Sequence, residues 1–268
     1  MDATQITATG TQIATTVATY IGLKEMMPKL LGPSFDYLGG EAKGYTEKGI
    51  NNLKKIFIKA ANNLGDPRLE TPGQVSPKVL KEILNEGYFC EDELGAEYYG
   101  GVLASSRTSN ARDDRGASFI KLVSRLSTYQ LRAHHVIFTV MRTRNLGFLG
   151  NAYEEQVRSN DLKTAIGGDD FARALDLNGT ENFTAMLAHV LGGLCRESLI
   201  LNRYAWGSIE DLTTRYGVTV NQPSFFACPA PLGFELFLWA NGLPDGEFAN
   251  VFERDLTFKR FPEVAYPD

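Results

Sequence analysis

Apolar residues recur at helical spacing along most of the N-terminal half of the chain. The pattern predicts a first helix that ends at Gly32-Pro33 and a second helix over 35–64 that ends at Gly65. Both ends rest on glycine and proline, which break helices. Residues 66–77 are expected to form a loop. Ser76-Pro77 then opens a short helix, because proline is well accommodated in a first helical turn.

Two further helices are indicated before residue 145. An acidic run, Glu91-Asp92-Glu93, marks the start of one of them, because carboxylates stabilise the N-terminal end of a helix dipole. Ser127 is expected to cap the next helix, which contains His135. We expect His135 to be a packed core residue.

The C-terminal third has a different pattern. Residues 145–180 are rich in glycine, asparagine and aspartate, and a strongly periodic helix with Thr180 as its N-cap follows them. A strand start is predicted at 198–201, β-structure over 216–226 and a closing helix over 231–239. Helix, strand, long connection, strand and helix is the order found in winged helices.

The predicted fold class is therefore mainly α. An N-terminal helical bundle, residues 1–144, precedes a winged-helix-like α+β part, residues 145–268. The boundary rests on the change of composition near Asn145 and on the change from helical to mixed periodicity.

Composition changes this picture little. Of the 268 residues, 43% are hydrophobic and 22% are charged, as in an ordinary globular protein. The net charge of −5 argues against a protein built to bind nucleic acid. Three widely spaced cysteines indicate free thiols in a reducing compartment. The first residues lack the pattern of a signal peptide, so we expect a cytoplasmic protein.

The segment from Ala3 to Leu23 contains no charged residue but has seven threonines, which make it too polar for a membrane span. A weak helical stripe and the glycines of the second predicted helix suggest a surface for self-association. The residues proposed for this interaction are Ile6, Ile13, Val17, Ile21, Gly39, Gly40 and Gly44. Two alternatives remain open: burial of residues 1–31 within one chain, and conditional membrane contact through residues 3–23.

No motif for catalysis, for cofactor binding or for metal binding is found, and no residue is assigned to any of these roles. The best acidic constellation has Glu93 and Glu97 on one helical face, with further carboxylates nearby in the sequence: Glu91, Asp92, Asp113 and Asp114. A hard-metal or nuclease site is one interpretation of this cluster, and a solvated helix start is the other. The second candidate for a DNA-binding surface is a group of basic residues: Lys43, Lys48, Lys54, Lys55 and Lys59.

Several segments together resemble the abortive-infection alpha (Abi-alpha) family of bacterial phage-resistance proteins. The first segment, residues 30–64, is a helix with several glycines that leads into a helix of basic and apolar residues. The second, residues 75–107, has an acidic pair before a helix that ends in Leu-Ala-Ser. The remaining segments are FIKLVSRLS within residues 116–138, LGGLCRESLI, and PLGFELFLWANG. The resemblance covers residues 30–242 in matching order. The chain departs from the family pattern at Tyr98-Tyr99-Gly100-Gly101 and at Tyr129-Gln130.

This resemblance implies a bacterial anti-phage defence protein that acts by binding a partner, by self-assembly or by both. The family has no established catalytic residues to transfer. A homo-oligomer is expected, with a phage-derived or host protein as a further partner. The alternatives are a winged-helix transcription regulator and a metal-dependent nuclease toxin.

Overall fold

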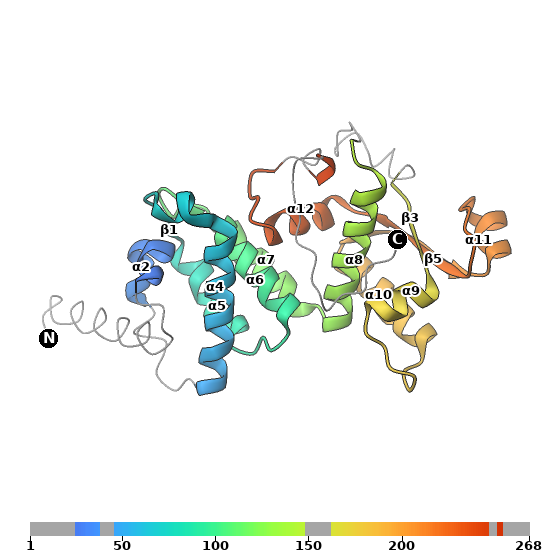
Figure 1. Ribbon diagram of the computed structural model, residues 1–268, viewed down its shortest axis with the longest axis horizontal. Helices are drawn as coiled ribbons and strands as arrows, with labels where there is room; N and C mark the ends of the chain where they lie inside the picture. The colour runs from blue at the N-terminus through green and yellow to red at the C-terminus, as the bar shows by residue number, and fades with distance from the viewer. Residues whose placement is uncertain (1–24, 38–45, 148–161, 247–250, 254–268) are drawn as a thin grey trace, which may run out of the picture. The chain divides into compact units, whose positions relative to one another are not determined.

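The computed structural model describes residues 25–37, 46–147, 162–246 and 251–253. These ranges contain ten α-helices and two small antiparallel sheets, which confirms the expectation of a mainly helical chain (Figure 1). Two compact units are formed. Unit 1 comprises Met1–Arg125 with Trp239–Pro244, and unit 2 comprises Leu126–Leu238 with Asp245–Asp268. The boundary expected at residue 144 lies within unit 2.

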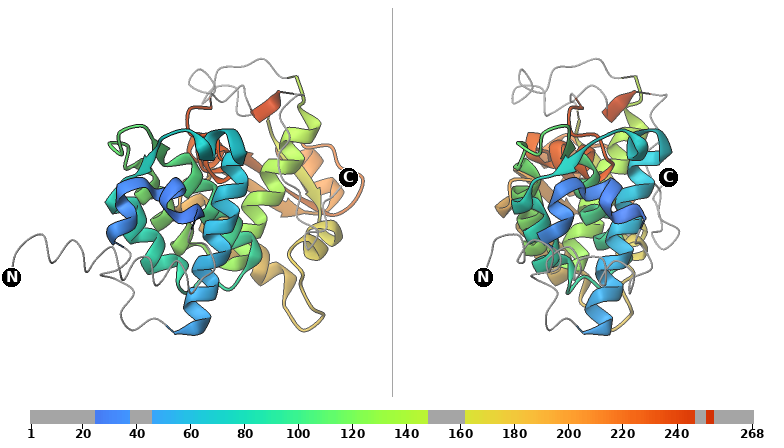
Figure 2. Two further views of the ribbon diagram at one scale, coloured as in Figure 1. Left: turned by 60° about the vertical axis from the view of Figure 1, so that its left-hand side comes forward. Right: turned by 90° about the vertical axis from the view of Figure 1, so that its left-hand side faces the viewer.

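Unit 1 is a group of helices around α6, which is buried along nearly its whole length. Helices α4, α5 and α7 all pack against α6, and α2 lies beside α4 (Figure 2). A two-stranded antiparallel sheet, β1 with β2, completes the unit. The elements in chain order are α2 (Met26–Leu31), η1 (Gly32–Tyr37), α4 (Glu47–Glu70), β1 (Gln74–Val75), α5 (Pro77–Gly87), α6 (Glu93–Ser105), β2 (Arg107–Thr108) and α7 (Arg115–Arg125).

Local signals fix most of the helix ends in unit 1. α2 ends before Gly32, as expected, and α5 begins with Pro77 in its first turn. The Asp92 side chain caps α6 by accepting a hydrogen bond from the Gly95 amide at 2.8 Å. The stop expected at Gly65 is a kink instead: this glycine has φ 67° and ψ 164°, and α4 resumes beyond it to Glu70.

Unit 2 combines helices with a three-stranded antiparallel sheet of order β3-β5-β4. Helix α8 packs against α9, α10 and β3, while α11 packs on β4 and β5. In Figure 1, α11 lies at the far end of the β4–β5 pair from α8. The elements in chain order are α8 (Thr128–Arg144), β3 (Thr164–Gly167), α9 (Gly168–Ala174), α10 (Phe183–Arg196), β4 (Ile200–Gly207), α11 (Ile209–Tyr216), β5 (Ser224–Pro229) and α12 (Pro231–Ala240).

The sequence analysis placed α8, α10 and α12 correctly and missed three elements of unit 2. Ser127 caps α8 in a capping box with Gln130, as the sequence indicated for this serine. The N-cap of α10 is Asn182 and not Thr180, because the Asn182 side chain accepts from the Ala185 amide at 3.0 Å. β3, α9 and α11 were not expected, and the second stretch of β-structure begins at Ser224 rather than near residue 216.

Both faces of the unit 2 sheet are covered by apolar contacts. On one face Phe171 of α9 packs on Phe225 of β5, with ring centroids 4.4 Å apart. On the other face a buried cluster joins α11 to the strands through Ala205, Leu212, Val218, Phe226 and Cys228. β5 is buried at every position because it is the central strand. Within the described ranges, no helix is both long enough and apolar enough to cross a membrane.

Candidate functional site

The interaction residues predicted from the sequence lie outside the described part of the chain. They are Ile6, Ile13, Val17, Ile21, Gly39, Gly40 and Gly44. Gly49, the last glycine of the same predicted helix, is described. A Cβ atom at this position would lie 1.9 Å from the Tyr88 ring, so Gly49 is a close contact within unit 1. The proposal of self-association through residues 6–44 stays a prediction.

The acidic cluster and the group of basic residues meet each other between α4 and α6. Lys48 pairs with Glu91 at 2.6 Å, and Lys55 pairs with Glu93 at 2.6 Å. Lys59, which is mostly buried, contacts Glu97 at 2.6 Å. Two surfaces that seemed separate in sequence therefore form one ion-pair seam that joins the helices.

The electrostatics of this seam follow from the pairing. A hydrogen bond from Lys55 lowers the pKa of Glu93, and a second one from Lys59 adds to the effect. Burial alone would lower the pKa of Lys59, but its hydrogen bonds to Glu97 and Glu93 outweigh burial and raise it. Lys55 and Lys59 therefore favour the ionised form of Glu93. In the described residues no group of three or more His, Cys, Asp or Glu side chains is placed to hold a metal ion.

The other two acidic candidates also have basic partners. Asp113 binds the Arg115 guanidinium, with oxygen and nitrogen 2.6 Å apart, and Asp114 pairs with Lys78 at 2.8 Å. The hydrogen bond from Arg115 lowers the pKa of Asp113. These carboxylates fix the start of α7 and the contact between α5 and the loop before α7.

The histidines of α8 are core residues. His135 is buried, which confirms the prediction, and His134 is buried as well. The carbonyl of Gly233 lies 3.0 Å from Nε2 of His134, so this nitrogen donates its hydrogen to it. Desolvation lowers the pKa of His134 to about 4 and that of His135 to about 3. Both rings are therefore neutral at pH 7.

The cysteines are free, as the sequence indicated, and burial raises the pKa of Cys90 to about 12. A thiol with such a pKa is protonated at pH 7 and is a poor nucleophile. Cys90 donates a weak hydrogen bond to the Asp92 carbonyl at 3.5 Å. It is placed as a packing residue beside the start of α6.

Polar contacts near the α8 N-terminus tie α8 to α10. The Ser127 hydroxyl lies 3.0 Å from Nε2 of His189, and the Gln130 amide donates to the His189 carbonyl at 3.2 Å. Tyr129 donates to Glu181. Gln130 therefore serves both the cap of α8 and the contact with α10.

The exposed face of α10 carries few charged side chains. Asn182, Thr184, Ala185, Ala188 and His189 are exposed, and residues 182–195 contain no lysine or arginine. The first cation of the helix, Arg196, lies 3.5 Å from the Glu197 carboxylate. A helix that reads DNA instead presents amide and cationic side chains to bases and phosphates.

A group of exposed apolar side chains lies on β4 and α11. Trp206, Ile209 and Tyr216 are exposed by 40%, 43% and 45%. We call these three residues the β4–α11 patch; Trp206, opposite Phe225, lies on the α9 side of the sheet, and Tyr216 lies on the α11 side. Ile209 and Tyr216 lie at the ends of α11, on either side of the buried Leu212, and Tyr216 also packs on Phe226 with centroids 5.4 Å apart. The sequence analysis treated this segment as a connection, although a tryptophan in a polar stretch was a usable signal.

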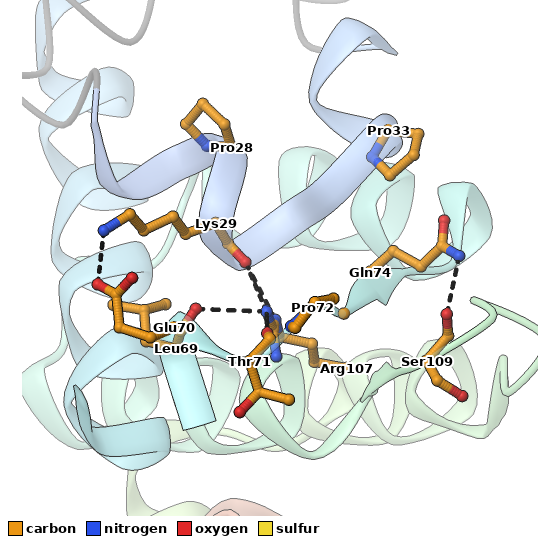
Figure 3. A pocket seen from close by; sticks show the side chains of 11 residues that line it. Pro28, Lys29, Pro33, Leu69, Glu70, Thr71, Pro72, Gln74, Arg107 and Ser109 are labelled. Carbon is orange, nitrogen blue, oxygen red and sulfur yellow. Dashed lines mark hydrogen bonds and ion pairs between the residues drawn. The ribbon is translucent and has the colours of Figure 1, made fainter. Parts of the chain in front are cut away.

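A pocket of about 350 Å³ lies in unit 1 between α2, η1 and the segment that follows α4 (Figure 3). Three prolines line it, Pro28, Pro33 and Pro72, and the Arg107 guanidinium lies at its centre. The guanidinium donates to the carbonyls of Lys29 at 2.8 Å, Arg68 at 2.9 Å and Thr71 at 2.6 Å. Because these carbonyls belong to the C-terminal ends of α2 and α4, Arg107 stabilises both helix ends.

We expect Arg107→Lys to lower the free energy of unfolding by about 2–3 kcal/mol, because an ammonium group cannot satisfy carbonyls in the planar pattern of a guanidinium. Urea denaturation of the full chain measures the change. Arg112→Lys, at an exposed position of the same unit, is the matched control and should be neutral within about 0.5 kcal/mol. Equal stability of the two variants would contradict the structural role of Arg107.

Comparison of the chain with protein-family models, with curated proteins and with solved structures finds no match.

Proposed function

We propose that this chain is an anti-phage defence protein, similar to the Abi-alpha family, that acts by binding a protein partner and by self-assembly. The ordered resemblance over residues 30–242 supports the defence role. One structural observation supports the binding mode. Of the five large apolar side chains exposed in the described residues, three form the β4–α11 patch. Tryptophan and tyrosine are enriched among the residues that dominate protein–protein binding energy.

We further propose that unit 2 is a winged helix and that unit 1 is the helical bundle expected from the sequence. The support is the order of elements, α8, β3, α9, α10, β4, β5, together with the sheet order β3-β5-β4. In this arrangement α10 takes the place of the recognition helix. The segment between β4 and β5, which includes α11, takes the place of the wing.

The same arrangement makes DNA binding the second candidate function. The α10 surface argues for a protein partner, because residues 182–195 contain no lysine or arginine to contact phosphates. DNA binding would show as a salt-dependent mobility shift of duplex DNA at micromolar protein. The third candidate, a metal-dependent nuclease, is less well supported because lysines pair with the carboxylates that it would need.

The defence proposal is tested by phage infection of cells with and without the gene. We expect the wild-type gene to reduce phage plating, and the double variant Trp206→Ser/Ile209→Ser to lose protection by about tenfold or more, as the removal of two binding residues would. Leu146→Ser is the matched control, since Leu146 is also an exposed apolar residue of unit 2 but lies outside the patch.

Two results would contradict the proposal. If phage plate equally well on cells with and without the wild-type gene, the protein has no defence role. If the double variant and Leu146→Ser both protect fully, the β4–α11 patch is not the binding surface. Circular dichroism and thermal unfolding of the purified variants exclude misfolding as the cause of any loss.

A further inference from the structure

β4 is an edge strand of the unit 2 sheet, because the strand order is β3-β5-β4. The opposite edge strand, β3, is covered: α8 packs beside it, and Arg144 of α8 donates to the Ala165 carbonyl. In the described ranges, no residue outside β5 forms a backbone hydrogen bond with residues 200–207. An edge strand with unpaired N–H and C=O groups is a template for a further strand. The outer edge of β4 is therefore open to pairing.

The α11 face of β4 carries a cation near one end of its regular part and a carboxylate near the other. Ala205 and Cys228 belong to the buried cluster on this face. Arg203, two positions before Ala205, lies on the same face, and its positive charge opposes the rise in pKa that burial causes at the Cys228 thiol. Arg203 is exposed and pairs with no carboxylate in the described part of the chain. A Cβ atom on Gly207 would lie 3.5 Å from Oδ2 of Asp211, so this carboxylate lies over Gly207.

Two aromatic side chains lie on the other face of the same segment. Trp206 is opposite Phe225 of β5, whose ring packs on Phe171 of α9. Tyr204 is two positions from Trp206 and therefore points to the same side of the sheet. A Cβ atom on Gly192 of α10 would lie 3.9 Å from the Tyr204 hydroxyl, so Tyr204 reaches α10. Trp206 remains 40% exposed, and a strand added to the β4 edge would cover it.

We propose that β4 of one copy pairs antiparallel with β4 of a second copy, with Ala205 opposite its equivalent. β4 is regular from Tyr204 to Gly207, and an irregularity separates this part from Ile200, so the pairing is centred on the regular part. Opposite residues of two antiparallel strands lie on the same face, so Trp206 of each copy lies beside Tyr204 of the other. Such cross-strand aromatic pairs stabilise a sheet.

Charge complementarity selects this register. Arg203 of each copy lies opposite Gly207 of the other, where the Asp211 carboxylate is, so the pair of copies gains two ion pairs. A register centred on Arg203 would instead place two guanidinium groups directly opposite each other, which is destabilising. Because both copies use the same edge, the contact is isologous and closes as a dimer.

This inference rests on the proposed self-assembly and names its surface, the β4 edge, and its occupant, a second copy of the chain. Trp206→Ser should weaken dimerisation about tenfold or more, because tryptophan is the type of side chain that dominates interfaces. Salt should weaken dimerisation as well, since the two ion pairs lie near the surface.

Charge reversal tests the inference by mass measurement in solution. The wild-type protein should be a dimer at micromolar concentration. Arg203→Glu should weaken dimerisation about tenfold or more, because carboxylates would face each other in both contacts, and Asp211→Arg should do the same with cations. An equimolar mixture of the two variants should form a 1:1 dimer, because each of its two contacts again joins a cation to a carboxylate. Recovery in the mixture also shows that both variants are folded.

A control variant and a backbone measurement complete the test. Arg196→Glu reverses an exposed cation of unit 2 that lies on α10 and not on β4, and this variant should dimerise like the wild type. Amide hydrogens of residues 203–207 that point to the outer edge should exchange more slowly in the wild-type dimer than in Arg203→Glu, because the second strand binds them.

A monomeric wild-type protein would overturn the inference. So would charge variants that dimerise like the wild type, a mixture of the two that stays monomeric, or equal amide exchange at β4 in the wild type and in Arg203→Glu. If the wild type is monomeric while the Trp206 double variant still loses protection against phage, the β4 pairing falls and the proposed defence role stands. If the dimer forms as expected while the gene leaves phage plating unchanged, the pairing stands and the defence role falls.

Discussion

Gly101→Ala is expected to lower the free energy of unfolding by about 3 kcal/mol or more, at the upper end of the cost of overpacking a core. Gly101 lies on α6, where the end of α12 crosses within unit 1. A Cβ atom at this position would lie 1.8 Å from the Ala240 carbonyl oxygen and 2.3 Å from its carbon. These are backbone atoms, so no side-chain rotation relieves the overlap.

The segment that Gly101 meets has few ways to move. The Ser105 hydroxyl donates to the Trp239 carbonyl at 2.9 Å, and Arg68 donates to the Gly242 carbonyl at 3.2 Å. The Trp239 ring packs on Phe119 at 4.8 Å. Shifting Ala240 away from a new methyl group would therefore break contacts on both sides of it.

Thermal and urea unfolding of the full chain measure the effect. A loss of about 3 kcal/mol corresponds to a fall in Tm of about 5–6 °C for a protein of this size. Gly179→Ala is the matched control, because Gly179 is exposed in a turn and no atom lies within 4 Å of its Cβ position. The control should be neutral within about 0.5 kcal/mol. Equal stability of the two variants would contradict the close approach of α6 and Ala240.

Acidification from pH 6.5 to pH 5.0 is expected to destabilise unit 2 strongly through the two buried histidines of α8. The pKa of each is lowered in the folded state, to about 4 for His134 and about 3 for His135, against the ordinary value of 6.5 for a histidine. Above pH 6.5 both states are neutral and no stability is lost. Below pH 6.5 the unfolded chain takes up protons that the folded chain excludes, so stability falls as the pH falls.

The slope grows as the unfolded chain takes up protons, and near pH 5.0 it approaches about 1.4 kcal/mol per pH unit for each histidine, and so about twice that value for the pair. The window above pH 5.0 isolates the histidines. Carboxylates with lowered pKa values, such as Glu93, lose their contribution only at lower pH. The loss ends as the pH passes the folded-state values, because both states are then protonated.

Urea denaturation at several pH values measures the slope. His135→Leu should reduce the slope by about half, because one of the two titrating groups is removed. Phe237→Leu is the matched control: Phe237 packs near both histidine rings, at 6.4 Å from His134 and 6.0 Å from His135. This variant should lower stability equally at every pH. A wild-type slope in His135→Leu would show that His135 is not excluded from protons in the folded state.

The sequence by itself determined the elements that depend on a few neighbouring residues. Ser127 with Gln130 begins α8, Pro77 begins α5 and Gly32 follows the end of α2. These signals are local because a cap or a break involves groups within one or two turns of the helix. The apolar spacing in α5 and α10 also identified buried positions, such as Leu80 and Leu191.

Short elements with weak periodicity could not be predicted from the sequence. β3 has four residues in a glycine- and aspartate-rich stretch, and it is a strand because it pairs with β5, with Ile166 opposite Phe225. α11 has one buried residue, Leu212, which packs on a cluster formed by two strands. Neither segment contains enough apolar residues to define a period.

Only the tertiary structure decided which charged and polar groups meet. Lys59 and Glu97 are 38 positions apart, and Arg107 donates to a carbonyl 78 positions away. The acidic cluster and the lysines were each visible in the sequence, but their pairing was not. A local pattern specifies which face of a helix is polar, whereas its partner depends on how distant helices pack. The contact of Gly101 with Ala240 and the exposure of Trp206 likewise depend on how segments distant in the sequence pack together.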